Sequence, residues 1–150
     1  MASRKWVYVS HAERTAMIVG GPGLSKGAVG CSEMLEHLPY GDFPKALSEI
    51  HRVSRRYALL SLPDSTRVYR LDIQIPKIGE LKMLIRLQRL KVPRHKFDGE
   101  HYWEIGKAGY PLRRVMGEMQ RAGFEIKKTY RVFEMPYHRF FVLAKSEKKG

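Results

Sequence analysis

Two segments of the chain place apolar residues at helical spacing. In residues 42 to 53, apolar side chains recur three or four positions apart with charged side chains between them, which predicts an amphipathic helix. The apolar positions are Phe43, Ala46, Leu47, Ile50 and Val53. A second helix is predicted after Pro111, where a similar stripe runs to Met119 and Gly123 marks the end.

Apolar runs too short for helices predict three strands. Residues 57 to 62 form one run that stops at Pro63, the pattern of a strand buried in a parallel sheet. Residues 124 to 133 and 139 to 144 follow the second helix and are separated by a short turn segment. This order predicts an α/β fold whose parallel sheet ends in an antiparallel hairpin at its C-terminal edge.

The remaining segments carry weaker patterns. Residues 17 to 30 are rich in glycine, so we expect a loop that ends in at best a poor strand. Residues 32 to 38 predict a short helical turn capped by Ser32. From Ile78 to about Leu90 we expect a helix, because Leu81, Leu84 and Ile85 share one side.

Composition and charge limit the partners and the compartment. The 150 residues suit one domain, no apolar run approaches the ~20 residues of a membrane span, and we expect a cytoplasmic protein. The single cysteine excludes an intramolecular disulfide. A net charge of +13 suits anionic partners such as RNA, acidic lipids or a phosphorylated substrate, and equally suits a merely solvated basic surface.

Residues 31 to 39, Cys-Ser-Glu-Met-Leu-Glu-His-Leu-Pro, carry a specific motif. The segment resembles the one after the fourth strand of class I S-adenosylmethionine-dependent methyltransferases of the ubiquinone and menaquinone methylase type (methyltransferase type 11-like). In that family an S-E-V-L-E-H-L motif ends the strand and lines the cofactor site. Residues 45 to 53 resemble the family's next helix, residues 57 to 63 its fifth strand, and the last third its closing elements.

This resemblance implies the C-terminal half of a methyltransferase domain in residues 31 to 146, a partial Rossmann-like sheet with its N-terminal strands missing. The family's glycine-rich turn and ribose-binding acid would lie in earlier strands, and Gly20 to Gly23 imitate that turn only superficially. We expect residues 1 to 30 to be a poorly matching, unrelated segment, and residues 147 to 150 a basic tail. The chain alone should then bind S-adenosylmethionine weakly or not at all.

The resemblance also implies a role for individual residues. Those expected beside the cofactor are Cys31, Ser32, Glu33 and Leu35. Those expected to line the substrate are Glu36, Pro63, Tyr102 and Trp103, and His37 and His101 are expected to be catalytic. Two alternatives stay open: Cys31 as a small buried residue, and residues 101 to 104 as an aromatic cluster packed beneath a loop.

A metal site is the alternative for the same residues. Glu33, Glu36 and His37 are spaced to share one helical face, and some methyltransferases of this class hold a divalent ion with such an E-x-x-E-H set. His101 would be the fourth ligand. Because E-H-L also occurs in members that bind no metal, we expect none here and assign His37 a proton-transfer role.

The expected function is methyl transfer from S-adenosylmethionine to a small molecule, in a chain that is truncated relative to the family. One alternative is a non-catalytic remnant or partner subunit. Another is an RNA-binding protein that uses its basic face. The missing first strands would leave an unpaired sheet edge, which favours a homo-oligomer.

Overall fold

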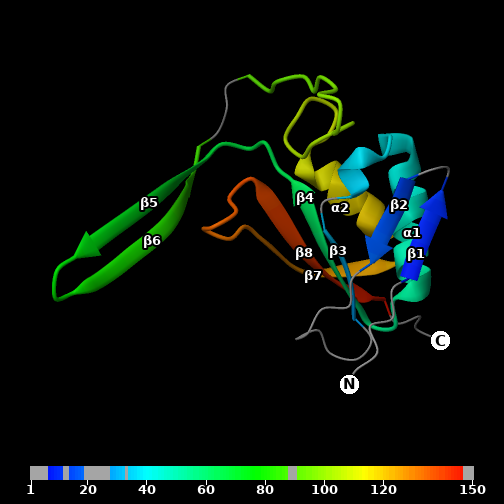
Figure 1. Cartoon of the computed structure of the whole chain (residues 1–150), viewed down its shortest axis with the longest axis horizontal. Coiled ribbons are helices and arrows are strands. Elements are labelled where there is room, and N and C mark those ends of the chain that lie inside the picture. The colour runs from blue at the N-terminus through cyan, green and yellow to red at the C-terminus, as the bar shows by residue number, and fades with distance from the viewer. Residues whose placement is uncertain (1–6, 12–13, 19–27, 33, 88–90, 147–150) are drawn as a thin grey trace.

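A four-stranded mixed sheet forms the centre of the molecule (Figure 1). The computed structural model describes residues 7–11, 14–18, 28–32, 34–87 and 91–146. The strands run in the order β3-β4-β8-β7, with β3 and β4 parallel and β8 antiparallel to both of its neighbours. Their bounds are β3 Ala28–Ser32, β4 Tyr57–Pro63, β7 Phe124–Tyr130 and β8 His138–Lys145. The expected mixed α/β sheet with a closing antiparallel hairpin is therefore present.

Two α-helices connect these strands and contact each other. The helix α1, Phe43–Val53, joins β3 to β4, and α2, Leu112–Arg121, precedes β7. The helices predicted for these two segments are confirmed, and the chain reverses after α2 at Gly123, whose φ of +93° suits glycine. Neither described helix is long and apolar enough to cross a bilayer.

The hydrophobic core lies between the helices and the sheet. Residues in β8 alternate between buried and partly exposed, so one face of this strand points inward. The helices present their apolar stripes to that face, as the sequence spacing predicts. Core members include Phe43, Leu47 and Ile50 from α1, Val115 and Met119 from α2, Leu60 and Leu62 from β4, and Phe141 and Leu143 from β8.

One prediction for the N-terminal third is wrong. The poor strand before Cys31 is a full strand, β3, because parallel pairing with the strongly apolar β4 outweighs its weak intrinsic propensity. The expected loop region is preceded by a hairpin of β1, Val7–His11, and β2, Arg14–Ile18. The glycine-rich residues 20 to 23 lie outside the described residues.

The helical turn expected at residues 32 to 38 is shorter than predicted. Only the 3₁₀ turn η1, Leu35–His37, forms, and Ser32 belongs to β3 instead of capping a helix. A second 3₁₀ turn, η2, Tyr40–Asp42, leads directly into α1. Because η1 follows the carboxyl end of β3 so closely, it places Glu36 and His37 at that end of the sheet.

The helix expected from Ile78 to Leu90 is also wrong. This region forms a two-stranded antiparallel ribbon of β5, Val68–Ile75, and β6, Gly79–Arg86, which projects from the body (Figure 1). The apolar run fits a period of two as well as a helical period, and the turn decides between them. Lys77 and Gly79 have positive φ values of 68° and 133°, which a helix does not allow.

A long loop between β6 and α2 is fastened to the body at two points. The amide of Tyr102 donates to the carbonyl of Glu36 at 2.8 Å, and the amide of Ile105 donates to the carbonyl of Pro63 at 3.0 Å. Trp103, between these points, is fully buried among the core residues. His101 is thus held close to η1, although 63 residues lie between it and His37 in the sequence.

A buried ion cluster joins the ends of β4, β7 and β8. Asp64 directly follows β4 and pairs with Arg139 at 2.6 Å and with Arg131. Burial by itself would raise the pKa of Asp64, but hydrogen bonds from Thr66, Arg139 and Arg131 outweigh it and hold this pKa below its ordinary value. The carboxylate therefore stays ionised and forms ion pairs with two buried guanidinium groups.

Replacing Asp64 should destabilise the fold strongly. Asp64→Asn leaves two buried arginines without their counter-charge, so we expect a loss of about 3–5 kcal/mol in the free energy of unfolding at neutral pH. Because the folded-state pKa is depressed, the wild-type advantage should persist above about pH 4 and fade as the pH falls through that lower pKa. Urea unfolding at several pH values measures this. The exposed control Asp72→Asn should cost less than about 0.5 kcal/mol.

Candidate functional site

The candidate site lies at the carboxyl ends of the parallel strands β3 and β4. This is the edge of an α/β sheet at which ligands usually bind. The turn η1 follows β3, and the loop that carries His101 is hydrogen-bonded to the end of β4 through Ile105. Two chain segments distant in sequence therefore meet at one edge of the sheet.

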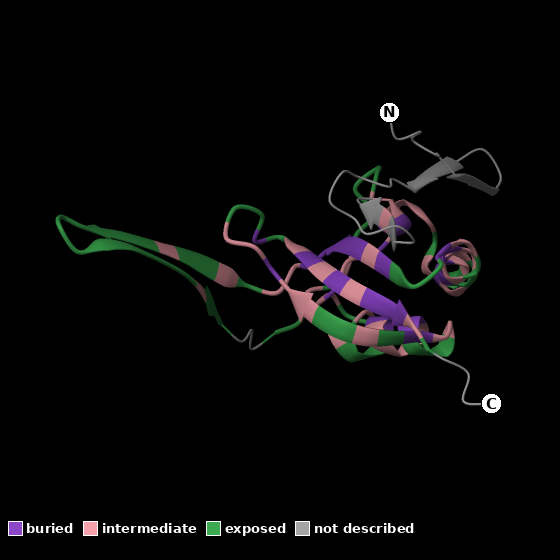
Figure 2. Cartoon of the chain, turned by 90° about the horizontal axis from the view of Figure 1, so that it is seen from below, coloured by how far each residue is buried: buried purple, intermediate pink, exposed green. Residues whose placement is uncertain are grey.

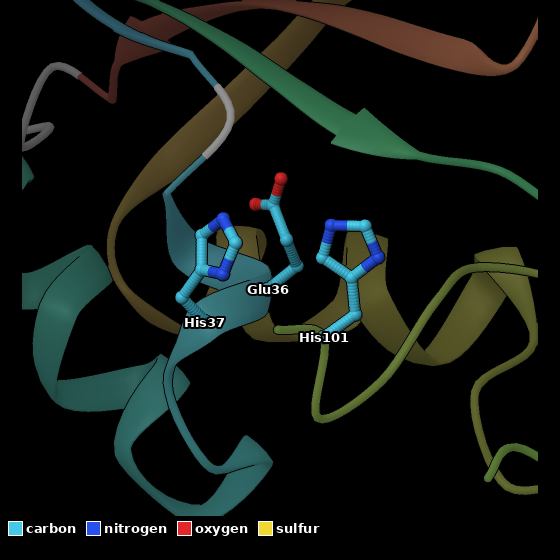
Figure 3. Close-up of side chains that lie close together, drawn as sticks. All are labelled: Glu36, His37 and His101. Atoms are coloured by element: carbon cyan, nitrogen blue, oxygen red, sulfur yellow. The ribbon is translucent and has the colours of Figure 1, made fainter. Parts of the chain in front are cut away.

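Glu36, His37 and His101 come together at this edge (Figure 3). A carboxylate oxygen and one ring nitrogen from each histidine all lie within 4.8 Å of one another. The two imidazole rings are 5.1 Å apart and tilted by 47°. In the close-up the carboxylate of Glu36 lies between the two rings. The three side chains form a compact acid and base cluster.

Glu36 is the buried member of the cluster, with only 1% of its surface exposed. Burial raises the pKa of this carboxyl, although its own backbone and the nearby His37, His101 and His138 act in the opposite direction. Its Oε2 atom has no hydrogen-bond partner among the described residues. A buried carboxylate oxygen without a partner is costly, which is typical of a group kept for a ligand or a proton.

A backbone hydrogen bond sets the tautomer of His37. Its Nδ1 lies 2.8 Å from the carbonyl oxygen of Glu100, and a carbonyl accepts only from a protonated nitrogen. In the neutral ring the lone pair is therefore on Nε2. A histidine oriented in this way serves either as a proton acceptor or as a metal ligand.

His101 is flanked by two further carboxylates that the sequence analysis missed. Its Nδ1 lies 3.4 Å from Asp98 and 3.8 Å from Glu104. Asp98 accepts the amide hydrogens of His101 and Glu100, and these bonds lower the pKa of its carboxyl. The symmetric spacing D-x-x-H-x-x-E around His101 is the signal that could have identified both acids.

Other residues expected at the site have different locations. The backbone of Cys31 and Ser32 forms the carboxyl end of β3, and Glu33 lies outside the described residues. Pro63 ends β4 and is buried. Leu35 and Trp103 are core residues, and Trp103 packs edge-on against Tyr40 and Phe43. Tyr102 is half-buried, with its ring 4.7 Å from that of Phe97.

No family model matches the chain, and no curated protein sequence is similar to it. Among solved structures, the chain is similar to the glycopeptide N-methyltransferase MtfA complexed with S-adenosyl-L-homocysteine, at a TM-score of 0.47 and 13% identity. That match covers 91% of this chain and 57% of that one. A second structure of MtfA matches at a TM-score of 0.48 and 15% identity, over 81% and 57% of the two chains. The chain thus spans a little over half the length of MtfA.

Removing the charge of Glu36 should stabilise the fold. A raised pKa in the folded state means that the ionised carboxylate opposes folding, a cost that grows above the ordinary glutamate pKa of about 4.3. We therefore expect Glu36→Gln to be more stable than the wild type at neutral pH and equally stable below about pH 4. Urea unfolding across this range measures both. Glu100→Gln, at an exposed site in the facing loop, should leave stability unchanged, and a less stable Glu36→Gln at neutral pH would contradict the interpretation.

Manganese distinguishes the two uses of the cluster. A divalent ion held by Glu36, His37 and His101 in the folded state would raise the melting temperature, since a ligand bound only by the folded form stabilises it. We expect no change with millimolar Mn²⁺, in line with proton transfer. A rise that disappears in His101→Asn would instead establish the metal site.

Proposed function

We propose that this chain is a methyltransferase-family protein in which Glu36, His37 and His101 form the proton-transfer part of a site for S-adenosylmethionine-dependent methylation of a small molecule. One observation carries the proposal. The residues that resemble the family motif follow the carboxyl end of a parallel strand, and there they meet His101 from a distant loop. The resemblance implies this meeting, and no feature of the local sequence spacing requires it.

The strand order supports the same proposal. The segment that resembles the family's fifth strand is β4, and it lies beside the strand before the motif, in parallel. The closing hairpin adds β8 next to β4 and β7 outside it, both antiparallel to their neighbours. The crossover through α1 and the antiparallel edge fit the C-terminal half of a doubly wound domain.

The polar groups at this edge suit a cofactor of this kind. The end of β3 offers backbone groups and small residues, and Glu36 offers a buried carboxylate oxygen without a partner among the described residues. When bound, S-adenosylmethionine supplies a methyl group on a sulfonium. A protein contributes mainly alignment to such a transfer, together with a base where the nucleophile carries a proton.

His37 is the proposed base. Its Nδ1 hydrogen is directed to the carbonyl of Glu100, so Nε2 takes the proton from the acceptor's nucleophilic atom. The buried Glu36 carboxylate then stabilises the imidazolium that forms. His101, flanked by Asp98 and Glu104, orients the acceptor on the other side of Glu36.

S-adenosylhomocysteine should bind this chain at the carboxyl end of β3, with a dissociation constant in the millimolar range. The resemblance covers only the second half of the family's domain, so only part of the cofactor contacts is expected, and each lost ~1.4 kcal/mol weakens binding tenfold. Backbone amide shifts in an NMR titration measure both the affinity and the location. We expect the shifts to cluster at residues 34 to 38 and at the end of β4.

ATP is the matched control, because a chain of net charge +13 attracts any polyanion. Shifts caused by ATP should spread over the basic surface and disappear at high salt. Shifts with S-adenosylhomocysteine that disappear in the same way would contradict a cofactor site. No shift at millimolar ligand would instead favour a non-catalytic partner subunit.

A further inference from the structure

The ribbon of β5 and β6 has one apolar face and one polar face. Cross-strand partners on the first face are Tyr69 with Ile85, Leu71 with Met83, Ile73 with Leu81, and Ile75 with Gly79. Partners on the second face include Asp72 with Lys82 and Gln74 with Glu80. Because side chains alternate along a strand, the apolar residues line the whole length of the ribbon on one side.

The body of the molecule contacts the polar face near the base of the ribbon. The charged ends of Arg70 and Lys82 lie over the ring of Phe133, at 5.7 Å and 5.8 Å from its centre. Leu84, on the same face, is partly buried. On the apolar face, Leu71 is partly buried and the other large side chains are exposed. The ribbon projects from the body and is coloured mostly as exposed (Figure 2).

Uncovered apolar surface on this scale is unusual for a solvated hairpin. Tyr69, Ile73, Ile75, Leu81, Met83 and Ile85 are 38% to 50% exposed. An isolated two-stranded ribbon is marginal in water, and contiguous apolar patches of a few hundred Å² mark interaction sites. The sequence repeats the apolar pattern over four cross-strand positions, so the face is built to be covered.

We propose that this apolar face is a self-association surface, which a second copy of the same chain covers by packing its own ribbon face to face. No cross-strand pair on the face contains a charged residue, so two copies bring no like charges into contact there. Nucleic acid or an anionic membrane would be recognised through basic side chains, which lie on the opposite face. A two-fold dimer needs only one such self-complementary face per chain.

The area of the apolar face reaches the lower limit for an interface between two copies. The exposed fractions of these side chains correspond to roughly 500 Å² per copy, so two copies bury about 1,000 Å² together. Stacked sheets of this kind pack about 10 Å apart with interdigitating side chains. This surface is separate from β3, the terminal strand of the four-stranded sheet, whose expected unpaired edge was the basis for predicting a homo-oligomer.

Sedimentation equilibrium of the full chain, from about 1 to about 100 µM, tests the proposal. We expect a wild-type dimer, and a dissociation constant at least tenfold weaker for Ile73→Lys, which places a charge on the apolar face. Gln74→Lys is the matched control, since it adds the same charge one residue away on the polar face. It should leave the dimer intact. Both variants should keep the melting temperature of the body, because neither position belongs to the core.

Three outcomes would overturn the proposal. One is a wild-type chain that stays monomeric over the whole range. Another is equal dissociation by Ile73→Lys and Gln74→Lys, which would mean that added charge alone separates the copies. The third is a monomer that binds vesicles of anionic phospholipid and loses that binding in Ile73→Lys, which would assign the face to a membrane. None of these results depends on whether the chain binds a cofactor.

Discussion

The ion pairs of the buried Asp64 carboxylate with Arg131 and Arg139 are the interaction on which the arrangement of the body depends. Asp64 follows the last residue of β4 and holds Arg139 from β8 and Arg131 from the end of β7. Its neighbours Pro63 and Ser65 form backbone hydrogen bonds with Ile105, which fasten the loop that carries His101. The short segment of residues 63 to 65 thus holds both the closing hairpin, through the Asp64 carboxylate, and the loop of the candidate site, through its backbone.

Stability and function make opposite demands on the two buried acids. Asp64 is satisfied by two arginines and by Thr66, so its charge contributes to the fold. Glu36 is buried at least as completely, yet one of its oxygens has no partner among the described residues and its pKa is raised. A fold that keeps such a group forgoes stability, which is the usual sign that the group acts on something outside the chain.

The sequence correctly predicts the helices and strands whose apolar pattern fits only one kind of secondary structure. The apolar stripes of α1 and α2 and the continuous run of β4 are long and bounded by clear signals, so their positions are correct. The residues of β3 have weak strand propensity, and the pairing with β4 that makes them a strand is a long-range property that local propensity cannot reveal. The ribbon was mistaken for a helix because Leu81, Leu84 and Ile85 fit both periods.

The site was predictable only in part, and for a similar reason. The motif identified Glu36 and His37, but their proximity to His101 depends on a loop whose course is set by the burial of Trp103 and Ile105. Asp98 and Glu104 lie close to His101 because each is three residues away from it, a spacing that can be seen in the sequence. Roles assigned to Cys31, Ser32 and Glu33 rest on the resemblance alone.

The base of the ribbon is connected to the ion cluster and to the loop of the candidate site. A substitution there can therefore affect more than one of them. The chain leaves the ion cluster at Thr66, whose carbonyl accepts from Arg131, and the ribbon is closed by a hydrogen bond from the amide of Leu87 to Arg67. It then continues into the loop that carries His101. Changes at the base of the ribbon therefore disturb the ion cluster and the site together. Only changes in its outer half, beyond the contacts with Phe133, separate association from chemistry.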